Sequence, residues 1–250
     1  MSGGLAWRQE PLPLLDWAAA PAGVRVSFTC RHGGVSSGAF ASLNMGALTA
    51  DDAANVAENR RRAVAGAGGD GATATMAWQV HGTDIREVTD APSSGRFLQP
   101  GAEPFPKSDG LVTSSRGRAL TLLTADCLPV AIAAADGSRL ALLHAGWRGI
   151  EAGVIEAGVA AVGGEAVAAI GPGAGPCCYE VGPEVHQAFG VPRNRRATID
   201  LRAIARERLR AAGVQEIREV ELCTICDGRF YSHRREGERA GRQAGIAWLS

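Results

Sequence analysis

Strand-like and helix-like patterns follow one another in this chain without a regular alternation. Residues 24–30 and 140–144 have the apolar spacing of strands, whereas residues 150–162 have the spacing of a helix. Asp200 can cap a further helix that runs to about residue 212. Doubly wound folds need strands and helices in regular succession, so this order predicts an α+β fold built on a mixed sheet.

The remaining strand candidates are short and lie between turns rich in Gly and Pro. They are residues 76–80, 85–88, 166–170, 219–223 and 245–249. We find no linker, low-complexity block or fixed-period repeat among the 250 residues. We therefore expect residues 1–250 to form a single domain.

Reactive side chains stand at the ends of the apolar runs. The longest run, residues 118–135, is interrupted by Asp126 and Cys127, and a carboxylate there is costly to bury unless it is paired or hydrogen-bonded. His144 ends another apolar run, and His81 lies in a short turn. Each alone could be a satisfied core residue. Together, His81, Cys127 and His144 offer zinc two imidazoles and a thiolate, with the fourth position left for water.

Composition excludes several classes of protein. Lys and Arg number 26 and Asp and Glu also 26, so net charge provides no attraction to nucleic acid or a membrane surface. Apolar residues make up 46%, which argues against intrinsic disorder. We recognise neither a secretory signal nor an apolar run of the roughly 18 residues that a membrane span needs. We therefore expect a cytoplasmic protein.

Five further cysteines lie outside this set. Cys223 and Cys226 form a C-x-x-C pair, which could be half of a zinc site or a redox dithiol. Cys177 and Cys178 are adjacent, which is poor for joint chelation, so we interpret these four as ordinary buried or half-buried thiols. Cys30 lies in a strand pattern, and we expect it in the core.

Familiar catalytic motifs are missing. The sequence lacks the zinc deaminase signature H-x-E with P-C-x-x-C, and it also lacks H-E-x-x-H and G-x-S-x-G. The Gly-rich residues 171–175 have no Lys-Ser/Thr ending, so they are not a Walker A loop.

A series of segments nevertheless identifies the chain with a known family. They are 31–36 (RHGGVS), 42–46 (SLNMG), 58–60 (ENR), 78–82 (WQVHG), 109–113 (DGLVT), 126–129 (DCLP), 144–149 (HAGWRG), 170–172 (IGP), 178–182 (CYEVG) and 230–235 (FYSHRR). Over nearly its whole length the chain resembles the YfiH-like family. That family was long labelled multicopper polyphenol oxidase (laccase) and was later described as purine nucleoside phosphorylases with adenosine deaminase activity.

The resemblance implies a fold, a metal and a reaction. The fold is an α+β sandwich of mixed sheets flanked by helices, of the YfiH type. The metal is zinc, whose ligands fall by motif on His81, Cys127 and His144. The reactions are phosphorolysis of adenosine, inosine, guanosine and methylthioadenosine, and hydrolytic deamination of adenosine. The partners are then a purine nucleoside and phosphate, with no nucleic acid or membrane, in a monomer or weak homo-oligomer.

Other side chains are candidates for the remaining roles. Asp126 and Glu180 are carboxylates that could move a proton, although strand alternation would turn Asp126 away from Cys127. Arg148 follows His144 closely and is a catalytic candidate that could clamp phosphate. The candidates for substrate binding are Arg31, Asn44 and Gln79.

Two alternative functions remain open. A copper-dependent polyphenol oxidase would agree with the laccase label, because two His and one Cys also suit copper. Five histidines, however, cannot supply a blue-copper site and a trinuclear cluster together. The chain could also be a non-catalytic, metal-bearing accessory protein that binds a small molecule or a muropeptide.

Overall fold

The computed structural model describes residues 4–89, 95–101, 105–193 and 195–250. Its first sheet has the order β1-β2-β3-β12-β7-β4, and its neighbours are antiparallel except for the parallel pair β4 and β7. The strands are β1 (Leu5–Arg8), β2 (Leu14–Trp17), β3 (Val24–Thr29), β4 (Thr75–Met76), β7 (Leu120–Thr124) and β12 (Gln243–Leu249).

The second sheet has the order β11-β10-β8-β9-β6-β5, with parallel pairs at both edges. Its strands are β5 (Ile85–Glu87), β6 (Gly110–Thr113), β8 (Leu128–Ala134), β9 (Leu140–Ala145), β10 (Ala166–Ile170) and β11 (Glu216–Glu219). The helices are α1 (Ala53–Gly66), α2 (Trp147–Ala152), α3 (Val154–Val162), α4 (Pro183–Phe189), α5 (Leu201–Ala211) and α6 (His233–Glu236). Short 3-10 helices cover Gly38–Phe40, Arg96–Leu98 and Gly237–Arg239.

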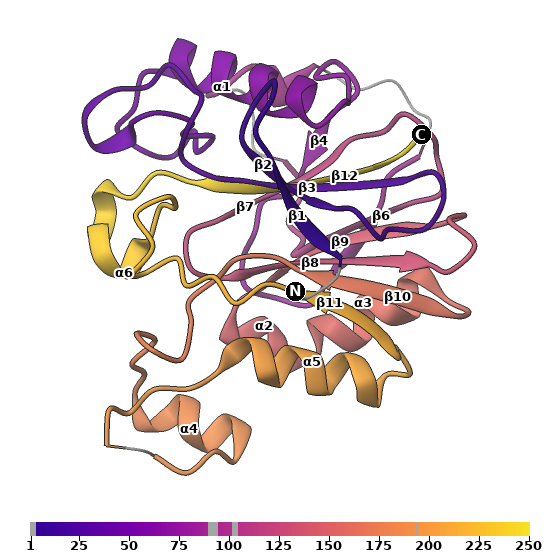
Figure 1. Cartoon of the computed structure of the whole chain (residues 1–250), viewed down its shortest axis with the longest axis vertical. Helices are drawn as coiled ribbons and strands as arrows, with labels where there is room; N and C mark the ends of the chain where they lie inside the picture. Colours follow the sequence, from indigo (N-terminus) through magenta and orange to yellow (C-terminus); the bar gives the residue numbers. More distant parts are fainter. Residues whose placement is uncertain (1–3, 90–94, 102–104, 194) are drawn as a thin grey trace.

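The two sheets pack face to face between layers of helices (Figure 1). Helix α1 covers the outer face of the first sheet, while α2, α3 and α5 cover that of the second (Figure 1). Strands β8 and β9 are fully buried, because alternate side chains face the helices and the first sheet. This explains their continuous apolar sequence and confirms the predicted α+β sandwich of mixed sheets.

The interrupted run at residues 118–135 is two strands in different sheets. Strand β7 pairs with β12 in the first sheet, and β8 pairs with β9 in the second. The connection between them crosses from one sheet to the other and contains Asp126 and Cys127. The polar interruption therefore marks the crossover.

The helix predicted over residues 150–162 is two helices, α2 and α3, because Gly153 between them has a φ of 104°. Asp200 caps α5 as predicted, and its carboxylate accepts a hydrogen bond from the Ala203 N–H. The strand expected at residues 219–223 is wrong in position. Strand β11 ends at Glu219 because its parallel partner β10 ends opposite it, at Ile170.

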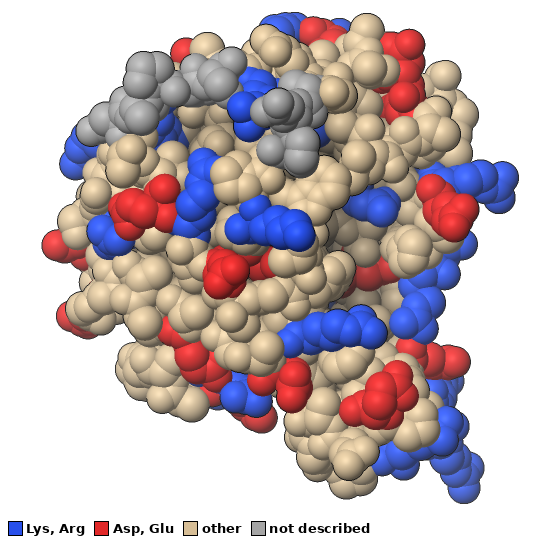
Figure 2. Space-filling model, turned by 180° about the vertical axis from the view of Figure 1, so that it is seen from behind, with Lys and Arg blue, Asp and Glu red and all other residues tan. Residues whose placement is uncertain are grey.

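Basic and acidic side chains are interspersed over the face shown in Figure 2, which has no extended surface of one sign. Within the described ranges no helix combines the length and apolar character needed to cross a bilayer.

Candidate metal site and cavity

Asp109 organises the loop that carries His81. Its carboxylate is fully buried and accepts hydrogen bonds from the backbone N–H groups of Val80 (3.0 Å), His81 (2.9 Å) and Gly82 (2.7 Å). These bonds hold His81 at a φ of 61°, in the left-handed region that side chains rarely adopt. Residues held in this way concentrate at functional sites because the surrounding structure must stabilise them.

The same carboxylate fixes the second histidine. Asp109 Oδ1 lies 2.8 Å from His144 Nδ1, and the Asp109 carbonyl accepts a hydrogen bond from the His144 backbone N–H. Burial raises the pKa of Asp109, but its bonds to His144 and to the loop N–H groups lower it overall. Because the Asp109 carboxylate occupies Nδ1, Nε2 is the available ligand atom of His144. This arrangement is typical of metal-binding histidines.

Cys127 completes a group that we call the His–Cys–His set: His81, Cys127 and His144. The ligand atoms all lie within 4.8 Å of one another, and Cys127 Sγ is 3.9 Å from His81 Nε2. The two imidazole centroids are 4.8 Å apart. Zinc bonds of about 2.0–2.3 Å hold tetrahedral N and S ligands about 3.3–3.8 Å apart, so small shifts would seat an ion.

Gly146 makes room for this set. A Cβ atom at that position would lie 2.9 Å from both Cys127 Sγ and His81 Cδ2, so a side chain would displace the ligands. The lack of a side chain at Gly146 and the Asp109 carboxylate on His144 both fit a metal ion held by these three residues. The structure thus brings together the three side chains that the sequence proposed as ligands.

The electrostatics of the set favour a thiolate. Burial opposes ionisation, but the charges and hydrogen bonds of His144 and His81 lower the pKa of Cys127 to about 6. Burial also opposes charge on His144, yet Cys127 and Asp109 raise its pKa to about 9. Since the thiolate is the form of cysteine that binds metals, Cys127 is ready to act as a ligand near neutral pH.

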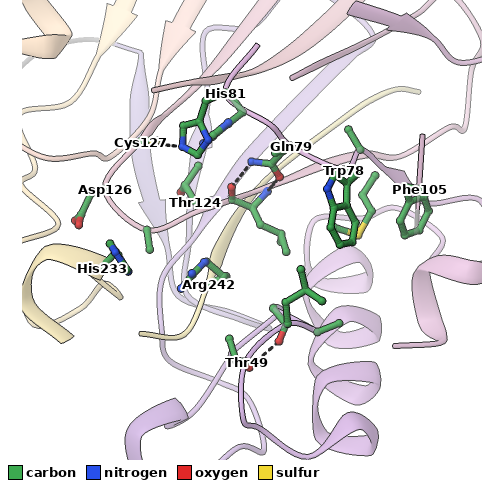
Figure 3. Close-up of a pocket in the computed structure, with 18 of the residues that line it drawn as sticks. Thr49, Trp78, Gln79, His81, Phe105, Thr124, Asp126, Cys127, His233 and Arg242 are labelled. Carbon is green, nitrogen blue, oxygen red and sulfur yellow. Dashed lines mark hydrogen bonds between the residues drawn. The ribbon is translucent and has the colours of Figure 1, made fainter. Parts of the chain in front are cut away.

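The His–Cys–His set lies on the wall of a cavity of about 560 Å³. This volume is in the range of pockets for small ligands. The rings of Trp78 and Phe105 lie at the opposite side of the cavity from His81 and Cys127 (Figure 3). Charged side chains also line it, namely Arg60, Arg96, Asp126, Arg148, Arg234 and Arg242.

Three of the other predicted site residues line this cavity. Arg148 is exposed to it and stacks its guanidinium on the Trp147 ring at 4.3 Å. Gln79 uses its side-chain amide on strand β7, donating to the Leu123 carbonyl and accepting from the Leu123 N–H (Figure 3).

Asp126 also reaches the cavity wall, with a φ of 89°. It lies outside any strand, so strand alternation does not set its direction. Its carboxylate accepts hydrogen bonds from the Thr224 and Ser232 hydroxyls and from the Arg234 N–H.

Arg31, Asn44 and Glu180 do not line the cavity. The Arg31 guanidinium pairs with Glu236 at 2.9 Å and lies over the Tyr231 ring. Asn44 is fully buried and donates to Asp51 and Thr49, so it shapes the loop that reaches the cavity. The Glu180 residue is exposed and pairs through its backbone with Thr198.

Sequence reasoning missed several residues of the site. Asp109 stood in a recognised segment, and a carboxylate directly before an apolar strand was the signal that could have identified it. Tyr179 and His233 also belong to recognised segments and line the cavity, as does Arg242, which no motif indicated. Burial raises the pKa of Tyr179 to about 12, so its hydroxyl stays protonated and can donate.

Comparison with known proteins places this architecture in a family. Residues 25–250 match the family model described as "Multi-copper polyphenol oxidoreductase laccase". A purine nucleoside phosphorylase of Xylella fastidiosa is 41% identical over 94% of this chain and 95% of its own length. The purine nucleoside phosphorylase YfiH of Escherichia coli is 34% identical over 92% of this chain and 95% of its own.

Solved structures give the same assignment. YlmD from Geobacillus stearothermophilus superposes with a TM-score of 0.86 at 33% identity, covering 97% of this chain and 98% of the other. A Bacillus licheniformis YfiH protein superposes with a TM-score of 0.88 at 27% identity, covering 98% and 99%. The sequence matches, the shared fold and the coverage of nearly the full length of both chains together identify one family. The chain therefore belongs to the YfiH-like family.

Proposed function

We propose that the chain is a zinc-dependent purine nucleoside phosphorylase that also deaminates adenosine. Its substrates would be adenosine, inosine, guanosine and methylthioadenosine, with inorganic phosphate as the second reactant. The observation that carries the proposal is the His–Cys–His set on the wall of a 560 Å³ cavity that also presents arginine side chains. The names of the relatives, purine nucleoside phosphorylases, support the same reaction.

The cavity has suitable chemistry for a neutral nucleoside. Trp78 and Phe105 offer aromatic faces on which a purine ring can stack, and Met76 adds an apolar contact. The opposite wall carries the polar side chains of His81 and Cys127 (Figure 3), and Tyr179 also lines the cavity. A flat aromatic base attached to a polar sugar matches this division between apolar and polar walls.

His81, Cys127 and His144 would hold the zinc ion, with Asp109 fixing the His144 ring. When bound, zinc would act as a Lewis acid that lowers the pKa of a water molecule and so supplies the nucleophile for deamination. The chain itself orients the two imidazoles through Asp109 and keeps the ligand space open at Gly146.

Arg148 is our candidate for phosphate binding. Arg148 is exposed and lines the same cavity as His144, and stacking of its guanidinium on Trp147 limits its freedom. Two parallel N–H groups of a guanidinium match two phosphate oxygens, which positions phosphate for attack on the sugar. Arg31 is tied to Glu236 outside the cavity, so we assign it to stability instead of substrate binding.

Asp126 is the better placed of the two candidate carboxylates. It lines the cavity beside Cys127, whereas Glu180 does not reach it. Three donors already hold the Asp126 carboxylate, and of these only Arg234 lines the cavity, so we propose that Asp126 fixes Arg234 beside the substrate. Tyr179 also lines the cavity, and its protonated hydroxyl would donate a hydrogen bond to the bound nucleoside.

The family description favours one alternative, a copper-dependent polyphenol oxidase. Two His and one Cys suit a single copper ion. In the described part of the chain, however, the other group of potential ligands contains cysteines only. His186 and His233 each contact a backbone carbonyl, and neither belongs to this group of cysteines. Several histidine-rich copper centres are therefore not assembled there.

One assay separates these functions. The purified protein is incubated with adenosine, with and without phosphate, and the products are separated by chromatography. We expect adenine only when phosphate is present, and inosine in both reactions. Formation of neither product by zinc-loaded protein, together with oxidation of a phenol by copper-loaded protein, would replace our proposal with the oxidase.

A further inference from the structure

Four cysteines outside the His–Cys–His set gather in loops beyond the ends of two strands of the second sheet. Cys177 and Cys178 follow strand β10 through a Gly-rich turn, and Cys223 and Cys226 follow strand β11. These strands are parallel neighbours, so both loops begin at the same end of the strand pair. Backbone pairing of Gly173 with Cys223 extends the contact beyond the strands.

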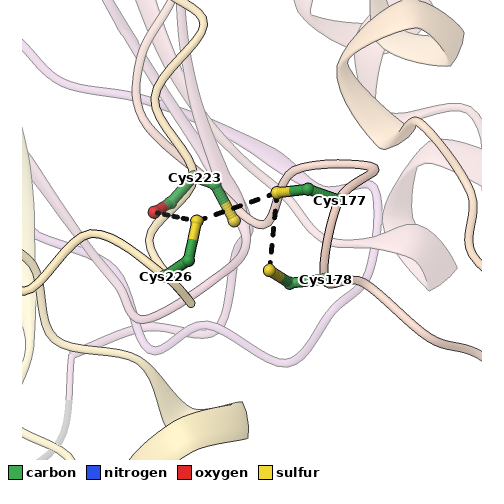
Figure 4. Close-up of side chains that lie close together, drawn as sticks. All are labelled: Cys177, Cys178, Cys223 and Cys226. Atoms are coloured by element: carbon green, nitrogen blue, oxygen red, sulfur yellow. Dashed lines mark hydrogen bonds between the residues drawn. The ribbon is translucent and has the colours of Figure 1, made fainter.

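The four sulfur atoms form one compact group (Figure 4). Cys177 Sγ lies 3.7 Å from Cys226 Sγ and 3.4 Å from Cys178 Sγ, and all four lie within 4.8 Å of one another. A zinc ion with bonds of about 2.3 Å holds four tetrahedral sulfurs about 3.8 Å apart. The observed spacing is close to that value, and all four cysteines are free thiols.

A backbone N–H group and a close glycine contact one member of the group, Cys223. The Gly175 N–H donates to Cys223 Sγ at 3.2 Å, and such bonds orient and stabilise a ligand sulfur. A Cβ atom on Gly175 would lie 2.9 Å from Cys223 Cβ, so only glycine allows this approach. Arg235 donates to the carbonyls of Thr224 and Ile225, which places a positive charge beside the C-x-x-C turn.

We propose that Cys177, Cys178, Cys223 and Cys226, the four-cysteine cluster, bind one zinc ion as a second metal site. Four thiolates complete the tetrahedral shell and leave no position for a substrate, so the site is structural. Binding is not a redox step: the thiols lose their protons to solvent as Zn–S bonds form. The adjacency of Cys177 and Cys178, which argued against joint chelation, is overcome because the turn directs both sulfurs toward the C-x-x-C loop (Figure 4).

The cluster joins a loop of the cavity wall to a neighbouring loop that supports Asp126. Tyr179, which lines the cavity, directly follows Cys178. Thr224 lies inside the C-x-x-C loop, and its hydroxyl donates to Asp126 at 2.7 Å. Cross-linking these loops would therefore fix both Tyr179 and the support of Asp126, and the inference is independent of which reaction the cavity performs.

Metal analysis of purified variants tests the second site. We expect two zinc ions per wild-type chain, one in Cys127→Ala, and one in Cys223→Ser. The double variant should hold none. Cys30→Ala, which changes a buried cysteine outside both groups, is the control and should retain two.

Cobalt titration of the Cys127→Ala protein, after its metal has been removed with a chelator, provides a second measurement that needs no change to the cluster. We expect one equivalent of cobalt to produce the intense thiolate-to-metal absorption of a four-sulfur site, and zinc to abolish it. Failure of this folded variant to bind either ion would overturn the inference. So would mass spectrometry of the unreduced protein that found a disulfide among the four cysteines. Neither result depends on purine activity.

Discussion

The His–Cys–His set and the four-cysteine cluster differ in the number, type and placement of their ligands. The first has three potential ligands on the wall of a cavity, two of them imidazoles oriented by hydrogen bonds or strained backbone. The second has four sulfurs in loops at the end of two parallel strands, and none of its members lines the cavity.

This difference separates a site suited to catalysis from a site suited to stabilising the fold. A three-ligand site leaves a coordination position for water or substrate, whereas four thiolates close the shell. The His–Cys–His set is oriented by the fully buried carboxylate of Asp109. The four-cysteine cluster is contacted instead by a backbone N–H group of its own loop. Changes to each site should therefore have separable effects, and the following experiments compare them in order of expected size.

Removing the central ligand should have the largest effect. Cys127→Ala eliminates the only thiolate of the His–Cys–His set, so we expect loss of one zinc ion and of both purine activities to background. The fold should persist, because Cys127 is half-buried in a crossover and contributes little to the core. Product chromatography and circular dichroism check this. Retained activity would show that Cys127 is not a ligand.

Neutralising the charge behind the ligands should have the next largest effect. Asp109→Asn weakens the hold on His144 and on the His81 loop, and changes of this kind cost about 10–100-fold in metal affinity or activity. Competition with a zinc chelator measures the affinity. Metal in the four-cysteine cluster should dissociate as in the wild type, and equal weakening at both sites would contradict their independence.

Adding one methyl group beside each site compares them directly. Gly146→Ala places a Cβ atom 2.9 Å from Cys127 Sγ, and Gly175→Ala places one 2.9 Å from Cys223 Cβ. Crowding of this kind costs about 1–3 kcal/mol, which would correspond to about 5- to 150-fold in affinity, and each change should weaken only its own site. Gly228→Ala meets no atom within 4 Å and serves as the control. Chelator competition resolves the two sites.

The smallest effect should come from a residue that touches substrate but no metal. Arg148→Ala should raise the KM for phosphate by about tenfold, because a hydrogen bond to a charged group contributes about 1.5 kcal/mol or more. Metal content should not change at either site. Arg31→Ala should leave this KM unaltered and lower the melting temperature instead, since Arg31 pairs with Glu236. A raised phosphate KM in Arg31→Ala would reverse our assignment.

Local patterns identified much of the fold. Strands β3, β9 and β10 and the Asp200-capped helix α5 follow from apolar spacing and capping chemistry, both of which act over a few residues. Residues that need a distant partner were harder to place. Strand β11 was misplaced because its end is set by β10, and helices α4 and α5 lie between these two strands in the chain.

The sequence by itself determined the fold class and the family and proposed three metal ligands, because motif residues and apolar periodicity are local properties of the chain. Only the tertiary structure decided that residues 118–135 cross between sheets and that Asp109 holds both histidines. It also removed Arg31 from the cavity and gathered four cysteines into one cluster. These outcomes depend on contacts between segments far apart in the chain, and spacing along a sequence does not specify such contacts.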